Sequence, residues 1–277
     1  MVRTARGASG FPKVMPDRPF TPLTPMPADP DSPTPQRPDA PTRGSSTRAI
    51  LVAIAAPVEL DAVCRGCGLD PGVVTPWRAQ TLAPGVDLVL TGVGKANAAG
   101  GVARVFDPDR HAGVMSLGIG GTLDERSPIG SVVLGESSLF ADEGGQTPEG
   151  FTACARMGFP LTRFPDDEIR CDPDWLGAWS GRVDRVARIA TVSTCSGTDA
   201  LAREVRARTG AEVEAMEGAA VGLVSRAIDP GVAFAELRVV SNTTGDRGGQ
   251  RWALEEAMGR LSGVLGRLGL VEGGAAG

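Results

Sequence analysis

The chain has 277 residues, 28 basic and 33 acidic side chains, and a formal net charge of −5. This mildly acidic balance argues against a nucleic-acid surface, which requires clustered basic charge. No run of about 18 apolar residues is present, so we expect no membrane-spanning helix. The N-terminus lacks the continuous apolar segment of a secretory signal. Five cysteines are too few for a disulfide scaffold in a chain of this length, which favours a cytoplasmic protein with reduced thiols.

The N-terminal segment is rich in proline. Half of the 22 prolines lie between Pro12 and Pro41. Proline has no backbone donor, and the segment has little apolar surface from which to build a core. We therefore predict that residues 1–47 form a disordered, extended tail, with an SH3-type ligand or a misassigned start codon as alternatives. Residues 48–277 are long enough for one well-buried domain.

In that domain, continuous apolar runs alternate with helical patterns. The runs predict buried strands at 48–55, 86–94, 112–121, 130–138, 185–193 and 232–242. Helices are predicted from Pro57 onward, at 95–106, at 198–210 and at 250–268, and residues 211–216 lead into a further helix through about Ile228. This alternation indicates an α/β fold with a central, mixed but mostly parallel sheet that is flanked by helices.

Ligands of such sheets bind at the carboxyl ends of the strands. Five polar or glycine-rich features fall at those ends: Glu59, the loop 118–121, Glu214, Glu217 and Asn242. Other chemistries have weaker support. The single histidine, His111, is interpreted as a surface residue, and no GxSxG motif is present.

Cofactor and metal motifs are also weak. Cys64 and Cys67 form one CxxC without a second pair, so we expect no metal site. The glycines at 92 and 94 begin a dinucleotide-like loop, but Asn97 occupies the place of the third glycine. We therefore expect no cofactor.

Several segments, taken together and in order, resemble the superfamily of purine nucleosidases and nucleoside phosphorylases over about residues 48–268. They are AIAAPVE, TGVGKANAA, MSLGIGG, VEAMEG and LRVVSN. Within that superfamily, ADEGGQTPEGF and SNTTGDRGGQRWALEEAM look most like the futalosine hydrolase family. The resemblance implies a single-domain nucleoside-phosphorylase-like fold and a homodimer or larger homo-oligomer. It also implies hydrolysis of the N-glycosidic bond of futalosine, which releases hypoxanthine and dehypoxanthine futalosine in menaquinone biosynthesis. The implied partner is a small nucleoside, with no nucleic acid and no membrane.

The resemblance also implies roles for individual residues. Glu59 matches the acid that orients the attacking water, and Glu217 matches the carboxylate that holds the ribose hydroxyls. Met216 matches a methionine that packs on the sugar, and Asn242 stands where adenine-specific nucleosidases have an aspartate. The remaining candidates for substrate binding are Gly118, Ile119, Gly120 and Phe151, the last of which would stack on the base, line the pocket or lie in the core.

Asn242 carries its own chemical argument. Hypoxanthine presents N7 and O6 at one edge, and both are acceptors, whereas adenine presents an acceptor and a donor there. An amide nitrogen with two N–H groups suits the 6-oxopurine, and a protonated aspartate suits adenine. The residue type at this strand end therefore favours a 6-oxopurine substrate.

Three other functions stay open at this stage. A nucleosidase of the methylthioadenosine or S-adenosylhomocysteine type would share most of these motifs. A phosphorylase must bind a phosphate dianion, and the first glycine loop offers Lys95, which we expect at the head of a helix and pointing to solvent, but no arginine. A purine-binding protein without catalysis is the third alternative. The role of Glu214 is also open.

Overall fold

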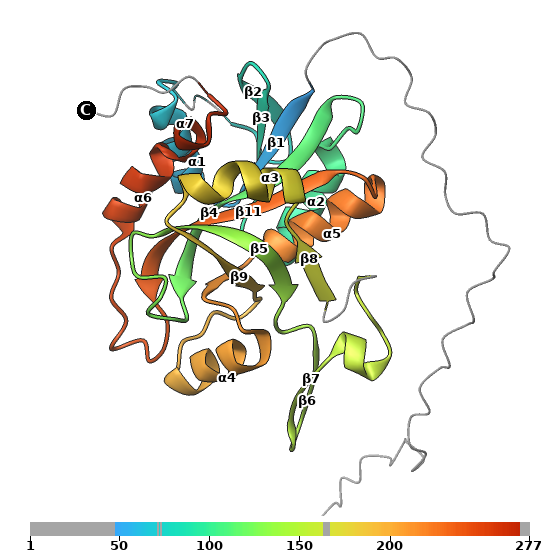
Figure 1. Cartoon of the computed structure of the whole chain (residues 1–277), viewed down its shortest axis with the longest axis vertical. Helices are drawn as coiled ribbons and strands as arrows, with labels where there is room; N and C mark the ends of the chain where they lie inside the picture. Colours follow the sequence, from blue (N-terminus) through green and yellow to red (C-terminus); the bar gives the residue numbers. More distant parts are fainter. Residues whose placement is uncertain (1–47, 71, 73, 163–166, 272–277) are drawn as a thin grey trace, which may run out of the picture. The chain divides into compact units, whose positions relative to one another are not determined.

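The computed structural model describes residues 48–70, 72, 74–162 and 167–271. The predicted proline-rich tail, residues 1–47, lies outside the described residues. The folded part is built on one nine-stranded sheet (Figure 1). Its strands are β1 (Ala49–Ile54), β2 (Ala79–Ala83), β3 (Val86–Leu90), β4 (His111–Thr122), β5 (Val132–Phe140), β8 (Glu168–Arg170), β9 (Arg185–Thr191), β10 (Val213–Ala215) and β11 (Ala233–Thr243).

The sheet is mixed, as the sequence predicted. Its order is β10-β9-β5-β11-β4-β1-β3-β2, with β8 paired to β5. Five strand pairs are parallel and four are antiparallel. The short strand β10 pairs with both β9 and β4, so that five strands close on themselves at one end of the sheet. This closure brings the residues after β10 next to the ends of β4 and β11.

Helices cover both faces of the sheet. They are α1 (Pro57–Gly66), α2 (Lys95–Val105), α3 (Pro173–Trp179), α4 (Asp199–Thr209), α5 (Gly218–Ile228), α6 (Leu254–Ser262) and α7 (Val264–Leu268). Helices α1, α6 and α7 lie together on one side, and α2 and α5 lie on the other (Figure 1). Val52 and Ile54 of β1 pack with the first group, whereas Leu51 and Ala53 pack with the second. Because side chains alternate along a strand, a strand buried on both faces needs the continuous apolar run seen in the sequence.

The predicted strands and helices are all present, with shifted ends. The predicted helix 250–268 begins only at Leu254 and is divided at Gly263 into α6 and α7. Several short elements were not predicted. Strands β2 and β8 are short and partly polar, and α3 has only seven residues, so none of them has a readable period. A separate hairpin is formed by β6 (Gly144–Thr147) and β7 (Gly150–Ala153).

The surface interpretation of His111 was wrong. Its side chain is buried at the start of β4, with Nε2 3.1 Å from Oδ2 of Asp87. The main-chain N–H of Asp107 donates to Nδ1. Burial lowers the pKa of His111, which favours the neutral ring despite the adjacent carboxylate. The position next to Arg110 in a polar turn gave no sign of this burial.

None of the helices in the described residues is long and apolar enough to cross a membrane.

Candidate active site

A cavity of about 280 Å³ lies at the carboxyl ends of β1, β4, β10 and β11. Its lining is mainly apolar, with Val58, Val93 and Ile119 among the side chains, and buried carboxylates face into it at a few points. Of the candidates from the sequence, the structure brings eight to its lining: Glu59, Ile119, Gly120, Gly121, Glu214, Met216, Glu217 and Asn242. Residues that the sequence analysis did not name also line it, among them Cys195, Ser196, Arg247 and Trp252.

Glu59 is fixed by both of its carboxylate oxygens. Pro57 begins α1, which places Glu59 in the first helical turn, where its Oε2 accepts from the N–H of Ala56 at 2.9 Å. Oε1 accepts from the N–H of Ile119 at 2.8 Å. Burial raises the pKa of Glu59, whereas the positive charge of Arg238 and the two N–H groups lower it. The result is an oriented carboxylate with a raised pKa, as a general base requires.

Glu217 stands at the start of α5 on the other side of the cavity. Its Oε1 accepts from the N–H of Gly94, in the first glycine loop, at 3.0 Å. Its Oε2 lies 3.3 Å from Nη2 of Arg238. Glu217 is 6% exposed, so its carboxylate can meet a ligand only from within the cavity.

Arg238 joins the acids of the site, and the sequence analysis did not predict it. It is 1% exposed; its Nε donates to Glu236 at 2.8 Å and its Nη2 donates to the hydroxyl of Ser116 at 2.8 Å. The carboxylates of Glu59, Glu217 and Glu236 raise its pKa, although burial opposes this. The signal was present in β11: Glu236 and Arg238 are two charges at alternate positions of an otherwise apolar strand.

Two glycines make room for this cluster. A Cβ at Gly118 would lie 2.5 Å from Oε1 of Glu59 and 2.6 Å from Nη1 of Arg238. Gly118 therefore lies directly behind the acid, not in the cavity lining. A Cβ at Gly218 would lie 1.8 Å from Oε2 of Glu236. Gly118 of the GIGG segment and Gly218 of the MEG segment are thus required by the charged side chains that pack on them.

The amide of Asn242 already forms two hydrogen bonds within the protein. Its Nδ2 donates to the carbonyl of Thr243 at 3.0 Å, and the hydroxyl of Ser241 lies 2.8 Å from its Oδ1. Since a carbonyl can only accept, the contact with Thr243 identifies the nitrogen. Both N–H groups of this amide were expected to contact the base, but one of them is engaged with Thr243, so one N–H remains for the base.

Two residues lie elsewhere than expected. Phe151 lines a different hollow beside the β6-β7 hairpin, where its ring centre is 4.0 Å from the guanidinium of Arg208. Lys95 begins α2 as predicted, but the prediction that its side chain points to solvent was wrong. Its side chain is 10% exposed and forms ion pairs with Asp142 and Glu143. Both acids lie in the segment after β5. The sequence does not show that this segment folds back against the glycine loop.

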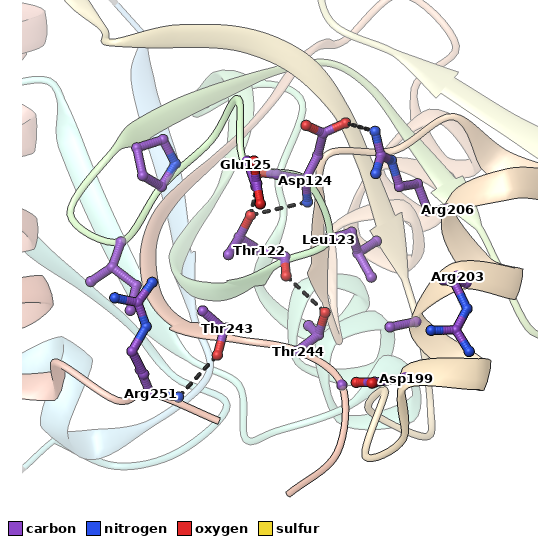
Figure 2. Close-up of a pocket in the computed structure, with 14 residues that line it drawn as sticks. Thr122, Leu123, Asp124, Glu125, Asp199, Arg203, Arg206, Thr243, Thr244 and Arg251 are labelled. Atoms are coloured by element: carbon purple, nitrogen blue, oxygen red, sulfur yellow. Dashed lines mark hydrogen bonds and ion pairs between the residues drawn. The ribbon is translucent and has the colours of Figure 1, made fainter. Parts of the chain in front are cut away.

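A larger cavity of about 550 Å³ lies at the ends of β4 and β11, with α4 along one side (Figure 2). Several of its polar groups bond one another. The hydroxyl of Thr244 donates to the carbonyl of Thr122, and Arg206 pairs with Asp124. The N–H of Arg251 donates to the hydroxyl of Thr243 at 2.9 Å. These bonds hold together the strand ends that carry the site.

Residues 50–269 match the family model described as the phosphorylase superfamily. Futalosine hydrolase from Streptomyces coelicolor is 36% identical over 230 residues, which are 79% of this chain and 94% of that protein. Futalosine hydrolase from Acidothermus cellulolyticus is 34% identical over 229 residues, 81% of this chain and 91% of that protein. This chain belongs to the futalosine hydrolase family of the phosphorylase superfamily.

Solved structures share the fold of this superfamily member. A 5'-methylthioadenosine/S-adenosylhomocysteine nucleosidase from Neisseria meningitidis gives a TM-score of 0.65 at 18% identity, over 80% of this chain and 99% of that chain. Futalosine hydrolase of Helicobacter pylori gives a TM-score of 0.62 at 15% identity, over 80% of this chain and 97% of that chain. The predicted nucleoside-phosphorylase-like fold is thereby confirmed.

Proposed function

We propose that this protein hydrolyses the N-glycosidic bond of futalosine and releases hypoxanthine. The curated relatives at 34–36% identity are futalosine hydrolases. The observation that carries the proposal is the pair of buried acids, Glu59 and Glu217, which face one cavity and share Arg238 between them. Asn242 lines the same cavity and offers an N–H to a leaving base.

The chemistry requires groups of these kinds. Cleavage passes through a sugar with oxocarbenium character, as in glycoside hydrolysis. A carboxylate close to the sugar stabilises the developing positive charge, and a donor at the purine stabilises the electrons that leave with it. In the proposed complex, Glu217 accepts from the ribose hydroxyls, and Met216 packs on the sugar. The free N–H of Asn242 donates to N7 of the base.

Glu59 is the proposed general base. Its two oxygens each accept one main-chain N–H, and each keeps a further lone pair. A water that donates to the carboxylate is held for attack on the anomeric carbon, and the proton passes to Glu59 as the bond forms. Because the pKa of Glu59 is raised, it lies closer to neutral pH, and this makes the transfer of a proton from water to Glu59 more efficient.

The charges near the glycine loop favour water over phosphate as the nucleophile. Lys95 is paired with Asp142 and Glu143, and Arg238 is buried among carboxylates. A phosphate dianion at this place would have to compete with those acids. Arg247 also lines the cavity, but it lies in the segment after Asn242 and not in the glycine loop. A purine nucleoside phosphorylase is therefore the less favoured function.

In the test, the full chain is incubated with futalosine in phosphate-free buffer, and the release of hypoxanthine is measured by chromatography. We expect hypoxanthine to be released at the same rate with and without added phosphate. The mass of the other product should be that of the free sugar and not of a sugar phosphate. A requirement for phosphate, with a sugar phosphate as product, would establish the phosphorylase instead. Cleavage of methylthioadenosine but not futalosine would place the protein with the adenine-specific nucleosidases, and hypoxanthine binding without turnover would indicate a binding protein. A part in menaquinone synthesis, a cytoplasmic location and a homo-oligomeric state stay predictions.

A further inference from the structure

Glu236 is a fully buried carboxylate that has no part in the mechanism above. It lies on β11, is 0% exposed and is not among the residues that line the cavity. Both of its oxygens are engaged: Nε of Arg238 donates to Oε1 at 2.8 Å, and the hydroxyl of Ser138 donates to Oε2. Burial raises the pKa of Glu236, but these two donors favour its ionised form. Any effect of Glu236 on a ligand must pass through these neighbours.

The pairing of β11 with β4 fixes where the guanidinium of Arg238 lies. Glu236 is the register partner of Ser116, and two residues later Arg238 is the partner of Gly118. Residues two apart on a strand point to the same face, so these side chains meet on one side of the sheet. Nη2 of Arg238 donates to the hydroxyl of Ser116 at 2.8 Å and lies 3.3 Å from Oε2 of Glu217. Glu236 therefore holds the guanidinium at Nε, while β4 and the start of α5 hold it at Nη2.

Glu236 also lies directly behind the acid that is proposed to hold the ribose. Gly218 follows Glu217 at the start of α5, and a Cβ there would lie 1.8 Å from Oε2 and 2.3 Å from Oε1 of Glu236. A larger residue at position 218 would push the carboxylate away from this place. The glycine thus keeps room for a third acid beside the two that face the cavity.

Three acids share one cation at this point. The carboxylates of Glu236, Glu217 and Glu59 all interact electrostatically with the guanidinium of Arg238. Within the part of the chain that the structure describes, no other cation forms an ion pair with any of the three. Burial raises the pKa of Glu59, and the charge of Arg238 lowers it. An arginine that faced only the two acids of the cavity would therefore make Glu59 a weaker base, and a third negative charge at Nε offsets this effect.

We propose that Glu236 is a positioning residue for the reaction: it holds Arg238 at Nε and balances part of its charge, so that the guanidinium orients the two acids of the cavity without neutralising them. The inference rests on the proposed function for the roles of those two acids. Arginine keeps its proton in proteins, so its influence on Glu59 can be adjusted only by the groups around it. Glu236 is such a group, and it acts on the reaction without contact with the substrate.

Two variants of Glu236 separate its charge from its position. Glu236→Gln keeps the length of the side chain: its oxygen still accepts from Nε of Arg238, and its N–H faces the hydroxyl of Ser138, which can accept. Only the negative charge is lost. Glu236→Asp retains the charge but is one methylene shorter, so it cannot hold Nε in the same place. Glu212→Gln is the matched control, because Glu212 is also buried and bonded to an arginine and a serine hydroxyl, but is not among the residues that line the cavity.

The first measurement is the profile of kcat/KM against pH, with futalosine and the full chain. In Glu236→Gln the charge of Arg238 acts undivided on Glu59, so we expect the acid limb to move to lower pH by about 1 unit. The plateau should fall by about 10-fold, because a weaker base takes the proton from water less readily. Glu236→Asp should lower the plateau but leave the limb in place, and Glu212→Gln should match the wild type. A limb that stays in place in folded Glu236→Gln, or moves equally in Glu236→Asp, would indicate a purely structural role and overturn the proposal.

The second measurement needs no turnover. Carbon-13 NMR of the full chain, labelled at the glutamate carboxyl carbons, follows the ionisation of Glu59, whose signal is identified by its absence in Glu59→Gln. We expect the midpoint of this titration to move to lower pH by about 1 unit in Glu236→Gln. The shift in a chain that does not cleave futalosine would refute the hydrolase assignment and retain the action of Glu236 on Glu59. An unmoved midpoint would overturn the proposal whether or not futalosine is cleaved.

Discussion

The main-chain N–H of Ile119 donates a hydrogen bond of 2.8 Å to the carboxylate of Glu59, 60 residues earlier in the chain. The acid belongs to the first turn of α1, and the donor belongs to β4, which is the parallel neighbour of β1. The second oxygen of Glu59 is held within its own helix by Ala56. The direction of the proposed base is therefore set jointly by a local helix cap and by the pairing of two strands.

Replacement of this acid tests its role directly. We expect Glu59→Gln to lower kcat/KM for futalosine by about 10²- to 10⁴-fold, because the amide cannot take the proton from water. An amide also has only one acceptor oxygen for the two N–H donors, so we expect a loss of about 1–3 kcal/mol in stability. Hypoxanthine affinity should change by less than about threefold, since the base lies at Asn242.

Steady-state kinetics, thermal melting and calorimetry measure these three effects. Glu255→Gln, at an exposed position of α6, is the matched control and should leave all three unchanged. Turnover within threefold of the wild type would remove Glu59 from the mechanism.

Gly118→Ala probes the space behind the acid. The added methyl would lie 2.5 Å from Oε1 of Glu59 and 2.6 Å from Nη1 of Arg238, so one of these side chains must move. We expect kcat/KM to fall by at least about 100-fold, because displacement of a catalytic group by about 1 Å is that costly. Gly259→Ala is the control: its methyl meets nothing on the surface of α6, and helix propensity predicts a gain of about 0.5–1 kcal/mol in stability. Normal activity in Gly118→Ala would contradict the packing described here.

The pH dependence of turnover should report the buried acid. Catalysis needs ionised Glu59, so kcat/KM falls as the pH drops through its pKa. Burial raises that pKa, and we therefore expect the acid limb above the ordinary glutamate value of 4.5. Arg238 lowers the pKa of Glu59, so in Arg238→Gln the limb should move to higher pH. The same variant should lose about 3–5 kcal/mol of stability, because it leaves buried carboxylates unpaired.

Profiles of kcat/KM against pH, recorded with denaturant unfolding, check both effects. Arg65→Gln removes an exposed arginine from α1 and serves as the control. An acid limb that stays in place in a folded, partly active Arg238→Gln would show that the arginine does not act on Glu59.

Asn242→Asp should move preference toward the 6-amino counterpart of futalosine. An ionised aspartate would oppose the carbonyl of Thr243, which the asparagine now contacts at 3.0 Å, and this favours protonation of the new carboxyl. In the complex, the single O–H of the protonated carboxyl turns from Thr243 to N7, and the other oxygen accepts from the 6-amino group. We expect the ratio of kcat/KM for the two substrates to shift by about 10- to 100-fold, with a larger shift at mildly acidic pH.

The control for this substitution is Asn97→Asp. The exposed Asn97 also donates to a main-chain carbonyl, that of Val93, so the change in local bonding is similar. It should leave the substrate ratio unchanged. An unaltered ratio in active Asn242→Asp would mean that Asn242 does not contact the base.

The proline-rich segment gives a prediction that rests on sequence alone. Because its spacing of prolines provides neither ladder donors nor an apolar face, deletion of residues 2–46 should leave activity and melting temperature almost unchanged. Thermal melting and futalosine kinetics of the shortened chain check this. A drop of several degrees would show that the segment packs on the domain.

The class of fold and the edge of the sheet where the site lies are readable from the amino-acid pattern. Continuous apolar runs such as residues 48–55 require strands that are buried on both faces, and Glu59 and Asn242 fall near the ends of such strands. These are local properties of pattern and position. They are readable because burial and the period of a strand act on neighbouring residues.

Which of these residues meet depends instead on the long-range packing of the folded chain. The pairing of β10 with β4 brings Glu214 to one side of Gly121, and the return of the segment after β5 gives Lys95 its acidic partners. The same long-range packing encloses Arg238 between Glu236 and Glu217, directs one N–H of Asn242 to Thr243, and leaves Phe151 in another hollow. Such contacts join residues far apart in the chain, and no local period encodes which strand end will face which side chain.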